Sequence, residues 1–355
     1  MLQGRSLEQL AVEIKRQNEA KKDFIVNTGE MFMGVTEPNE DGKQFTRLKL
    51  HDMAPFTINS IAHDQIGAKL GIPAKYYDRM LAEEPGLLAT NVNHWFQRQP
   101  SQRMIRTLDG TTRAFLSDRY RRIDNEEVAE AVLPIIGEMK DATVESCQLT
   151  DKRMYLKVLN PRVQTEITQG DIVQSGLLIT NSEVGMGSVS VMPLVYRLIC
   201  KNGMIAADSG MRKFHTGRIN EADWNYEIFR SVTIEADDKA FVMKLQDIVR
   251  ATAEIVQFER IVAAMKMGTE AKITSSDVPK VVQLATRDYG LTEHEGKGVL
   301  DHLIRGGDLS LYGLANSVTH AAQDVDNYDR STELEMVGWQ MLNMTRADWH
   351  SLNAA

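Results

Sequence analysis

The segment from His94 to Ile123 interleaves arginines with aromatic residues, a combination that can hold phosphates and stack on flat rings. It contains seven arginines against two aspartates. Guanidinium groups bind phosphate oxygens in pairs and lie well against aromatic faces. Mixtures of this kind are typical of single-stranded nucleic-acid sites. The residues are Arg98, Arg103, Arg106, Arg113, Arg119, Arg121 and Arg122, with Trp95, Phe96, Phe115 and Tyr120 among them.

A second polar region begins at Asn181-Ser182-Glu183 and runs through an apolar strand pattern to His215. Turn-forming residues stand at both ends of that pattern. We expect the basic and polar side chains here to complete one basic groove with the first segment. The residues concerned are Arg197, Lys201, Asn202, Arg212, Lys213 and His215.

The alternative for the first segment is structural. An arginine-rich antiparallel hairpin would use its rings as core, and its charges would pair with the acidic stretch from Asp124 to Glu145. The sequence leaves both possibilities open.

His215 suggests a second function, a metal-dependent nuclease or other hydrolase working with Asp208. Neighbouring Arg212 and Lys213 could set the charge of the imidazole. The chain has no HExxH pattern, no phosphate-binding GxxxxGK[ST] loop and no dinucleotide fingerprint. We therefore expect no metal and no cofactor, and no catalytic residue is assigned.

The acidic surface suggests a third function, that of a non-enzymatic protein-binding module whose partner is a basic protein of the host. The chain has 355 residues and a formal net charge of −8. A polynucleotide would therefore have to bind a local basic patch rather than the protein as a whole.

The composition is that of a water-soluble protein of two packed domains. No stretch is apolar enough for a membrane span, and the charged N-terminus is unlike a secretory signal. Two cysteines, Cys147 and Cys200, fit buried thiols in a reducing compartment. These features predict a cytoplasmic protein without a membrane partner.

Periodicity predicts an α+β fold with an antiparallel sheet domain, inserted helices and a mainly helical C-terminal subdomain. We place an amphipathic arm at 1–22, the sheet domain at 23–220 and the helical subdomain at 221–355. Asp109-Gly110 predicts a hairpin turn, and the stretch 124–140 predicts a helix that Pro134 kinks or breaks. Thr274 with Asp277, and Thr292 with Glu295, match capping boxes.

The stretch QIGAKLGIPAKYYDRM predicts two short helices around Gly71 and Pro73. It invites a helix-turn-helix interpretation, in which the second helix enters a DNA groove. Packing of one helix on another explains the pattern equally well.

Four blocks occur together and in order: QIGAKLGIPAKYY, AFLSDRYRRIDNEEV, NSEVGMGSVSV followed by RLICKNGM, and LYGLANSVTHAAQD. In this combination the chain resembles the phage/plasmid-like family known as domain of unknown function 932. The resemblance implies a mobile-element protein that acts near DNA replication or recombination. With the arginine segment, it favours a homo-oligomeric protein that binds or anneals single-stranded DNA.

Overall fold

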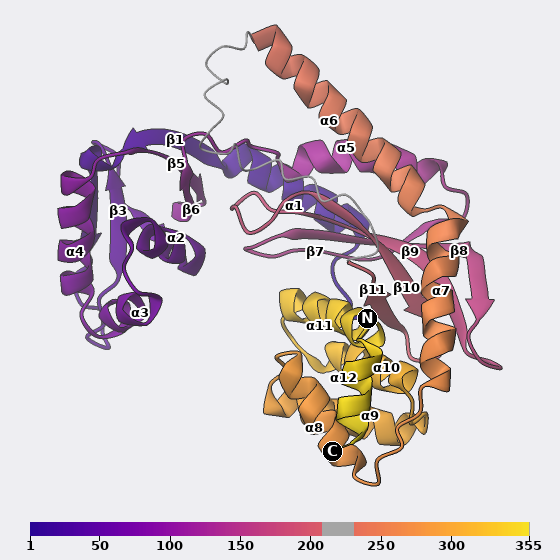
Figure 1. Ribbon diagram of the computed structural model, residues 1–355. Coiled ribbons are helices and arrows are strands. Elements are labelled where there is room, and N and C mark those ends of the chain that lie inside the picture. The colour runs from indigo at the N-terminus through magenta and orange to yellow at the C-terminus, as the bar shows by residue number, and fades with distance from the viewer. Residues whose placement is uncertain (208–230, 355) are drawn as a thin grey trace.

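The structure, a computed structural model, describes residues 1–207 and 231–354. It is an α+β protein with two sheets and a helical C-terminal region (Figure 1). The first sheet has the strand order β1-β5-β6-β4-β3-β2 and the second the order β11-β10-β9-β8-β7. All neighbouring strands are antiparallel except β4 and β6.

The first sheet is built from short strands near the N-terminus. They are β1 (Lys22–Asn27), β2 (Met31–Val35), β3 (Thr46–Leu50), β4 (Phe56–Ile58), β5 (Gln102–Leu108) and β6 (Thr111–Ser117). Helices α2 (Ser60–Leu70), α3 (Ala74–Glu83) and α4 (Pro85–Arg98) cover one face of this sheet. The alternating burial of β3 shows how its sequence, TRLKL, places Leu48 and Leu50 in that core and Arg47 and Lys49 in solvent.

The second sheet is buried on both faces. Its strands are β7 (Thr143–Leu149), β8 (Met154–Glu166), β9 (Ile172–Asn181), β10 (Ser190–Arg197) and β11 (Asn202–Ile205). Helices α1 (Leu7–Ala20), α5 (Asn125–Glu138) and α6 (Ser231–Thr252) pack on one face. The predicted N-terminal arm is thus part of the core, because Leu10 and Ile14 of α1 are buried there.

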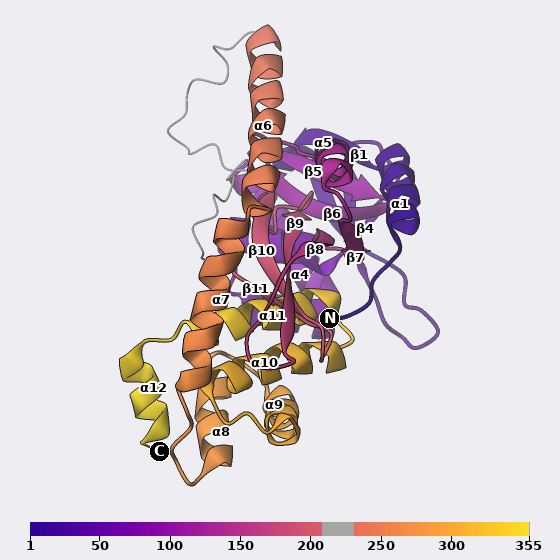
Figure 2. The same cartoon turned by 90° about the vertical axis from the view of Figure 1, so that its right-hand side faces the viewer.

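The helical region covers the other face. It consists of α7 (Ile255–Glu270), α8 (Val278–Asp288), α9 (Glu293–Gly306), α10 (Leu311–Ala321), α11 (Tyr328–Leu342) and α12 (Arg346–Asn353). In Figure 2, α6 and α7 follow one another as a column beside the second sheet. No helix in the described ranges is long and apolar enough to cross a membrane.

Local sequence signals explain most element ends. Asp109 and Gly110 have φ of 49° and 76°, the left-handed values that a type I′ hairpin turn requires, so the predicted hairpin is confirmed. Gly71 ends α2 with φ 67°. The capping box of Thr292 and Glu295 is also confirmed.

One local prediction was wrong. Asp277 is itself the N-cap of α8, and Thr274 instead bonds to Asn353, so these residues form no capping box. Of the two effects expected at Pro134, a kink or a break, the break does not occur, because α5 runs through Pro134 from Asn125 to Glu138. Both cysteines are free thiols; Cys147 is buried and Cys200 is partly exposed.

Candidate nucleic-acid interface

Arg106 is fully buried where the two sheets meet. Its Nε lies 2.9 Å from Asp23 Oδ1, and its Nη2 lies 2.7 Å from Asp124 Oδ1. Its Nη1 donates to the backbone carbonyl of Glu183 at 2.8 Å. Burial works against the charge of Asp124, but Arg106 and Lys21 outweigh it and hold the pKa of this carboxyl below its usual value. Each nitrogen of the Arg106 guanidinium therefore donates to an acceptor inside the protein, and none is left to bind a ligand.

Arg113 is held in the same place by a β-bulge. Arg106 pairs with Ala114 and Thr107 with Thr112, which leaves Arg113 as the extra residue of β6. A bulge redirects a side chain, and here Arg113 Nη2 reaches Glu183 Oε2 at 2.6 Å. The other oxygen of Glu183 accepts from Asn125 N, the first residue of α5, at 2.7 Å.

We call these ionic residues the junction cluster: Lys21, Asp23, Arg106, Arg113, Asp124 and Glu183. Lys21 follows α1, Asp124 precedes α5 and Glu183 follows β9, while Asp23, Arg106 and Arg113 lie on β1, β5 and β6 of the first sheet. Asp124 is the N-cap residue of α5 but makes no side-chain cap bond, because its carboxylate binds Arg106 and Lys21. The cluster joins the sheets.

The expectation of an open basic groove is therefore wrong for Arg106 and Arg113, whose exposed fractions are 0% and 8%. The structural alternative is confirmed for the pair of Arg106 with Asp124. Phe96 and Phe115 are also core residues, with their rings stacked at 5.8 Å between centroids. A folded molecule can offer none of these four side chains to a ligand.

Arg119 and Arg122 remain exposed on the loop after β6. Tyr120, between them, donates its hydroxyl to Ser182 O at 3.1 Å, and Ser182 Oγ donates to Lys152 O at 2.8 Å. Ser182 thus brings this loop together with the turn between β7 and β8. Lys152 there is exposed and Arg153 is half-buried. We call Arg119, Arg122, Lys152 and Arg153 the loop surface.

Sequence reasoning missed Lys152 and Arg153. They follow Thr150 and Asp151 in the turn between β7 and β8, and nothing in the local sequence indicates that this turn lies beside the arginine loop. Arg153 donates to Met186 O in the glycine-rich loop after β9. Gly187 has φ 154°, and a Cβ there would come within 2.8 Å of the Arg153 guanidinium. Glycine at this position therefore gives Arg153 its space.

The remaining arginines of the first segment are scattered. Arg98 is exposed at the end of α4, and Arg103 is half-buried on β5, where burial lowers its pKa. Arg121 pairs with Asp237 at 2.7 Å and lies over the Phe241 ring of α6. Arg122 keeps a side-chain exposure of 57% and lies 3.4 Å from Asp23.

The second predicted half of the groove lies at the far end of the second sheet. Ser190 pairs with Thr180 near the junction, whereas Arg197 pairs with Val173, seven residues further along β10, about 23 Å at the rise of a strand. Arg197 binds Asp171 at 2.6 Å, and Asn202 is buried against Thr319. Lys201 is exposed. The expectation that these three residues continue the first segment's groove is therefore wrong.

Asp208, Arg212, Lys213 and His215 lie outside the described residues, so the proposed hydrolase pair has no structural description. Within 1–207 and 231–354, no group of three or more His, Cys, Asp or Glu side chains is arranged to hold a metal ion.

Helices α2 and α3 pack on the first sheet as a pair. Tyr77 and Met80 of α3 are buried, and Tyr77 OH contacts His63 of α2 at 2.9 Å. On the exposed side, Arg79 pairs with Glu83. The packing interpretation of this segment therefore explains its pattern.

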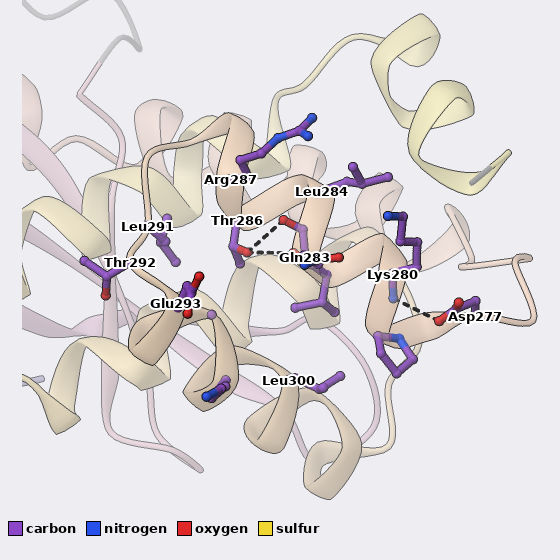
Figure 3. A pocket seen from close by; sticks show the side chains of 14 residues that line it. Asp277, Lys280, Gln283, Leu284, Thr286, Arg287, Leu291, Thr292, Glu293 and Leu300 are labelled. Carbon is purple, nitrogen blue, oxygen red and sulfur yellow. Dashed lines mark hydrogen bonds between the residues drawn. The ribbon is translucent and has the colours of Figure 1, made fainter.

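A cavity of about 770 Å³ lies between α8 and α9 in the helical region (Figure 3). Lys280, Arg287 and Lys297 line it together with Asp277 and Glu293. Asp277 accepts from Lys280 N, and Thr286 bonds the carbonyl of Val282, so these polar groups serve α8 itself. The residues that line this cavity do not form a recognisable catalytic or ligand-binding arrangement, so we assign no site to it.

No curated protein and no solved structure matches the chain. The family model described as Domain of unknown function (DUF932) matches residues 114–349, which include the junction cluster's Asp124 and Glu183 and nearly all of the helical region. That match covers well over half of the sequence, and on this ground the chain belongs to the DUF932 family.

Proposed function

We propose that this protein binds nucleic acid, with single-stranded DNA as the favoured ligand, and that the loop surface contacts the phosphate backbone. The observation that carries the proposal is the meeting of two basic loops at Ser182. Arg119, Arg122 and Lys152 are exposed there, whereas the arginines of the junction cluster are buried; Arg122 stays 57% exposed although it lies 3.4 Å from Asp23.

Charge supports a local site. The protein carries a net charge of −8, which disfavours phosphate binding over most of its surface. In the two loops 117–122 and 150–153, five arginines and lysines stand against Asp118 and Asp151. Backbone contacts of this kind position a polynucleotide without reading its sequence.

The activity we propose is binding or annealing without catalysis, by a homo-oligomer acting in replication or recombination of a phage or plasmid. The role in replication or recombination rests on the family resemblance. The homo-oligomer is proposed because annealing requires long stretches of two strands to be held side by side. Light scattering during size-exclusion chromatography, with and without single-stranded DNA, tests the oligomer.

Salt dependence of binding tests the loop surface. Each phosphate contact on a single strand contributes about −0.7 to the slope of log K against log salt concentration. We expect a slope of about −2 to −3 for the wild type, from three or four contacts. The variant Arg119→Gln/Arg122→Gln/Lys152→Gln should bind more weakly, with a slope smaller by about 2.

The matched control is Arg79→Gln/Arg287→Gln/Arg305→Gln, which removes three exposed arginines from α3, α8 and α9. It changes the net charge by the same amount, so it should leave the slope almost unchanged. An affinity that ignores salt, or an equal loss in the control, would exclude the loop surface as the site.

A further inference from the structure

The β2–β3 hairpin exposes two phenylalanines and two cations on one face. Along β3 and the residue before it, Phe45, Arg47 and Lys49 point to solvent, because Thr46, Leu48 and Leu50 are buried. Phe32 on β2 is exposed in the same way between buried Met31 and Met33. We call Phe32, Phe45, Arg47 and Lys49 the hairpin face.

The strand register places these side chains beside one another. Phe32 pairs with Lys49, and Gly34 pairs with Arg47. Phe45 extends the ladder, since its carbonyl accepts from Thr36 N at 2.8 Å and its N–H bonds Thr36 Oγ1 at 3.0 Å. Along β3, each ring or cation thus lies about 7 Å from the next.

The phenylalanine rings are open to solvent. Phe32 is 57% exposed and Phe45 is 56% exposed, although phenylalanine is a residue type that folding usually buries. The Phe32 ring leans over Gly34, since a Cβ at Gly34 would lie 3.7 Å from Phe32 Cε1. A glycine inside a strand often marks a place where another molecule approaches closely.

The two cations are not neutralised. Among the described residues, neither Arg47 nor Lys49 forms an ion pair, and the solvent-facing positions of β2, β3 and β4 carry no acidic side chain. Glu30, which directly precedes β2, is paired with His51 at 2.9 Å. This face therefore differs from the junction cluster, where every arginine meets a carboxylate.

We infer that the hairpin face binds single-stranded nucleic acid, with bases stacked on Phe32 and Phe45 and phosphates against Arg47 and Lys49. Sheet faces that bind single strands combine exposed rings with cations in this way, because unpaired bases offer flat faces and the backbone offers charge. A duplex hides its base faces, so this surface should prefer single strands. The inference rests on the proposed function for its ligand class and adds a second site.

An acidic protein partner would match the positive charge of Arg47 and Lys49, but it would not explain why two separated phenylalanine rings are exposed beside them. Rings spaced by a cation suit a ligand that alternates flat and charged groups. The nucleic-acid strand is therefore the occupant that the hairpin face favours.

The experiment measures binding of the full chain to a labelled oligothymidine of about 20 nucleotides, long enough to span one sheet face. We expect Phe32→Ala/Phe45→Ala to weaken binding of the oligothymidine by about tenfold or more. Binding of a duplex should change much less. With this second site the wild-type slope should steepen from about −2 to −3 to about −3.5 to −4, and Arg47→Gln/Lys49→Gln should reduce it by about 1.4. The matched control is Ile25→Ala, which removes a side chain 62% exposed on β1 of the same sheet.

Thermal melting of each variant shows whether the fold is kept, which these solvent-facing positions allow. If the wild type binds oligothymidine and the loop-surface variant weakens it, but the hairpin variants bind like Ile25→Ala, the inference is overturned and the proposed function stands. Equal losses for single strands and duplex would exclude stacking and also overturn it. If the wild type binds no single strand, the proposed function fails and this inference with it.

Discussion

Arg113 and Glu183 form an ion pair of 2.6 Å, from Nη2 to Oε2, across the junction of the two sheets. Their side chains are 10% and 5% exposed, so water screens the pair little. Glu183 also accepts from the first backbone N–H of α5, which connects the pair to the start of a helix. Arg113, which was predicted to hold a ligand, thus helps to hold the two sheets of the protein together.

Removing one partner of this pair should destabilise the protein strongly. Arg113→Met leaves the buried Glu183 carboxylate with Lys21, 3.6 Å away, as its one cationic neighbour among the described residues, and losing the closer partner costs about 3–5 kcal/mol in the free energy of unfolding. The double variant Arg113→Met/Glu183→Met should cost less than the sum of the single variants. Urea denaturation gives both values. Arg305→Ala, in an exposed pair with Asp301, is the control and should change stability by under about 1 kcal/mol. An Arg113→Met cost as small as the control's would contradict the account.

Lys157 and Glu335 form a second buried pair, 2.6 Å apart and fully buried on both sides, between β8 and α11. The Lys157 ammonium also lies 4.8 Å from the Tyr328 ring centroid, and Glu335 Oε1 has no hydrogen-bond partner among the residues that the structure describes. We expect Lys157→Met alone to destabilise by about 3–5 kcal/mol, and Lys157→Met/Glu335→Leu to recover most of this loss. Calorimetry of the three proteins measures it. A double variant no more stable than Lys157→Met would show that the pair's geometry, and not its charge, holds α11 to the sheet.

Stability should fall between about pH 6.5 and pH 4 because of His63. Burial lowers the pKa of His63 from 6.5 to about 4, while its two ring nitrogens contact Tyr77 OH and Thr46 Oγ1. The unfolded chain therefore takes up a proton at a higher pH than the folded one. The stability is complete above the unfolded pKa and is lost as the pH falls, by up to about 3 kcal/mol.

NMR titration of the His63 ring and urea denaturation at pH 7.5 and 4.5 check this prediction. His63→Gln should flatten the pH dependence in that window, even if it lowers stability overall. The control variant is His350→Gln, at an exposed position of the C-terminal helix α12. A His63 ring that titrates near its ordinary pKa would refute the assignment.

Gly338 should tolerate no side chain. A Cβ at this position of α11 would lie 2.3 Å from Thr319 Cγ2 and 3.0 Å from Ala315 O, both on α10. Because the second contact is backbone, the two helices would have to move apart, at about 1–3 kcal/mol. Gly306→Ala, where a Cβ meets nothing within 4 Å, should be neutral or slightly stabilising. Thermal melting of Gly338→Ala and Gly306→Ala compares the two positions, and equal melting temperatures would refute the close packing.

Local interactions made much of the fold predictable. The hairpin at Asp109-Gly110, the stop at Gly71 and the capping box at Thr292 depend on residues within a few positions of each other. Periodicity likewise identified the helix after Asp124 and the helical C-terminal region. The family was recognisable from short blocks of sequence. The nucleic-acid function and the oligomer stay predictions.

The amino-acid sequence by itself determined the α+β class, the local turns and caps, and which segments carry charge. Only the tertiary structure decided which charges are free. Arg106 and Arg119 look alike in sequence, yet one meets carboxylates from β1 and α5 in the interior and the other stays in solvent. The same holds for the hairpin face, whose strand pattern shows alternation but not which side helices cover. The physical reason is that a charge is neutralised by groups close in space, and Glu183 reaches Arg113 across 70 positions of the chain.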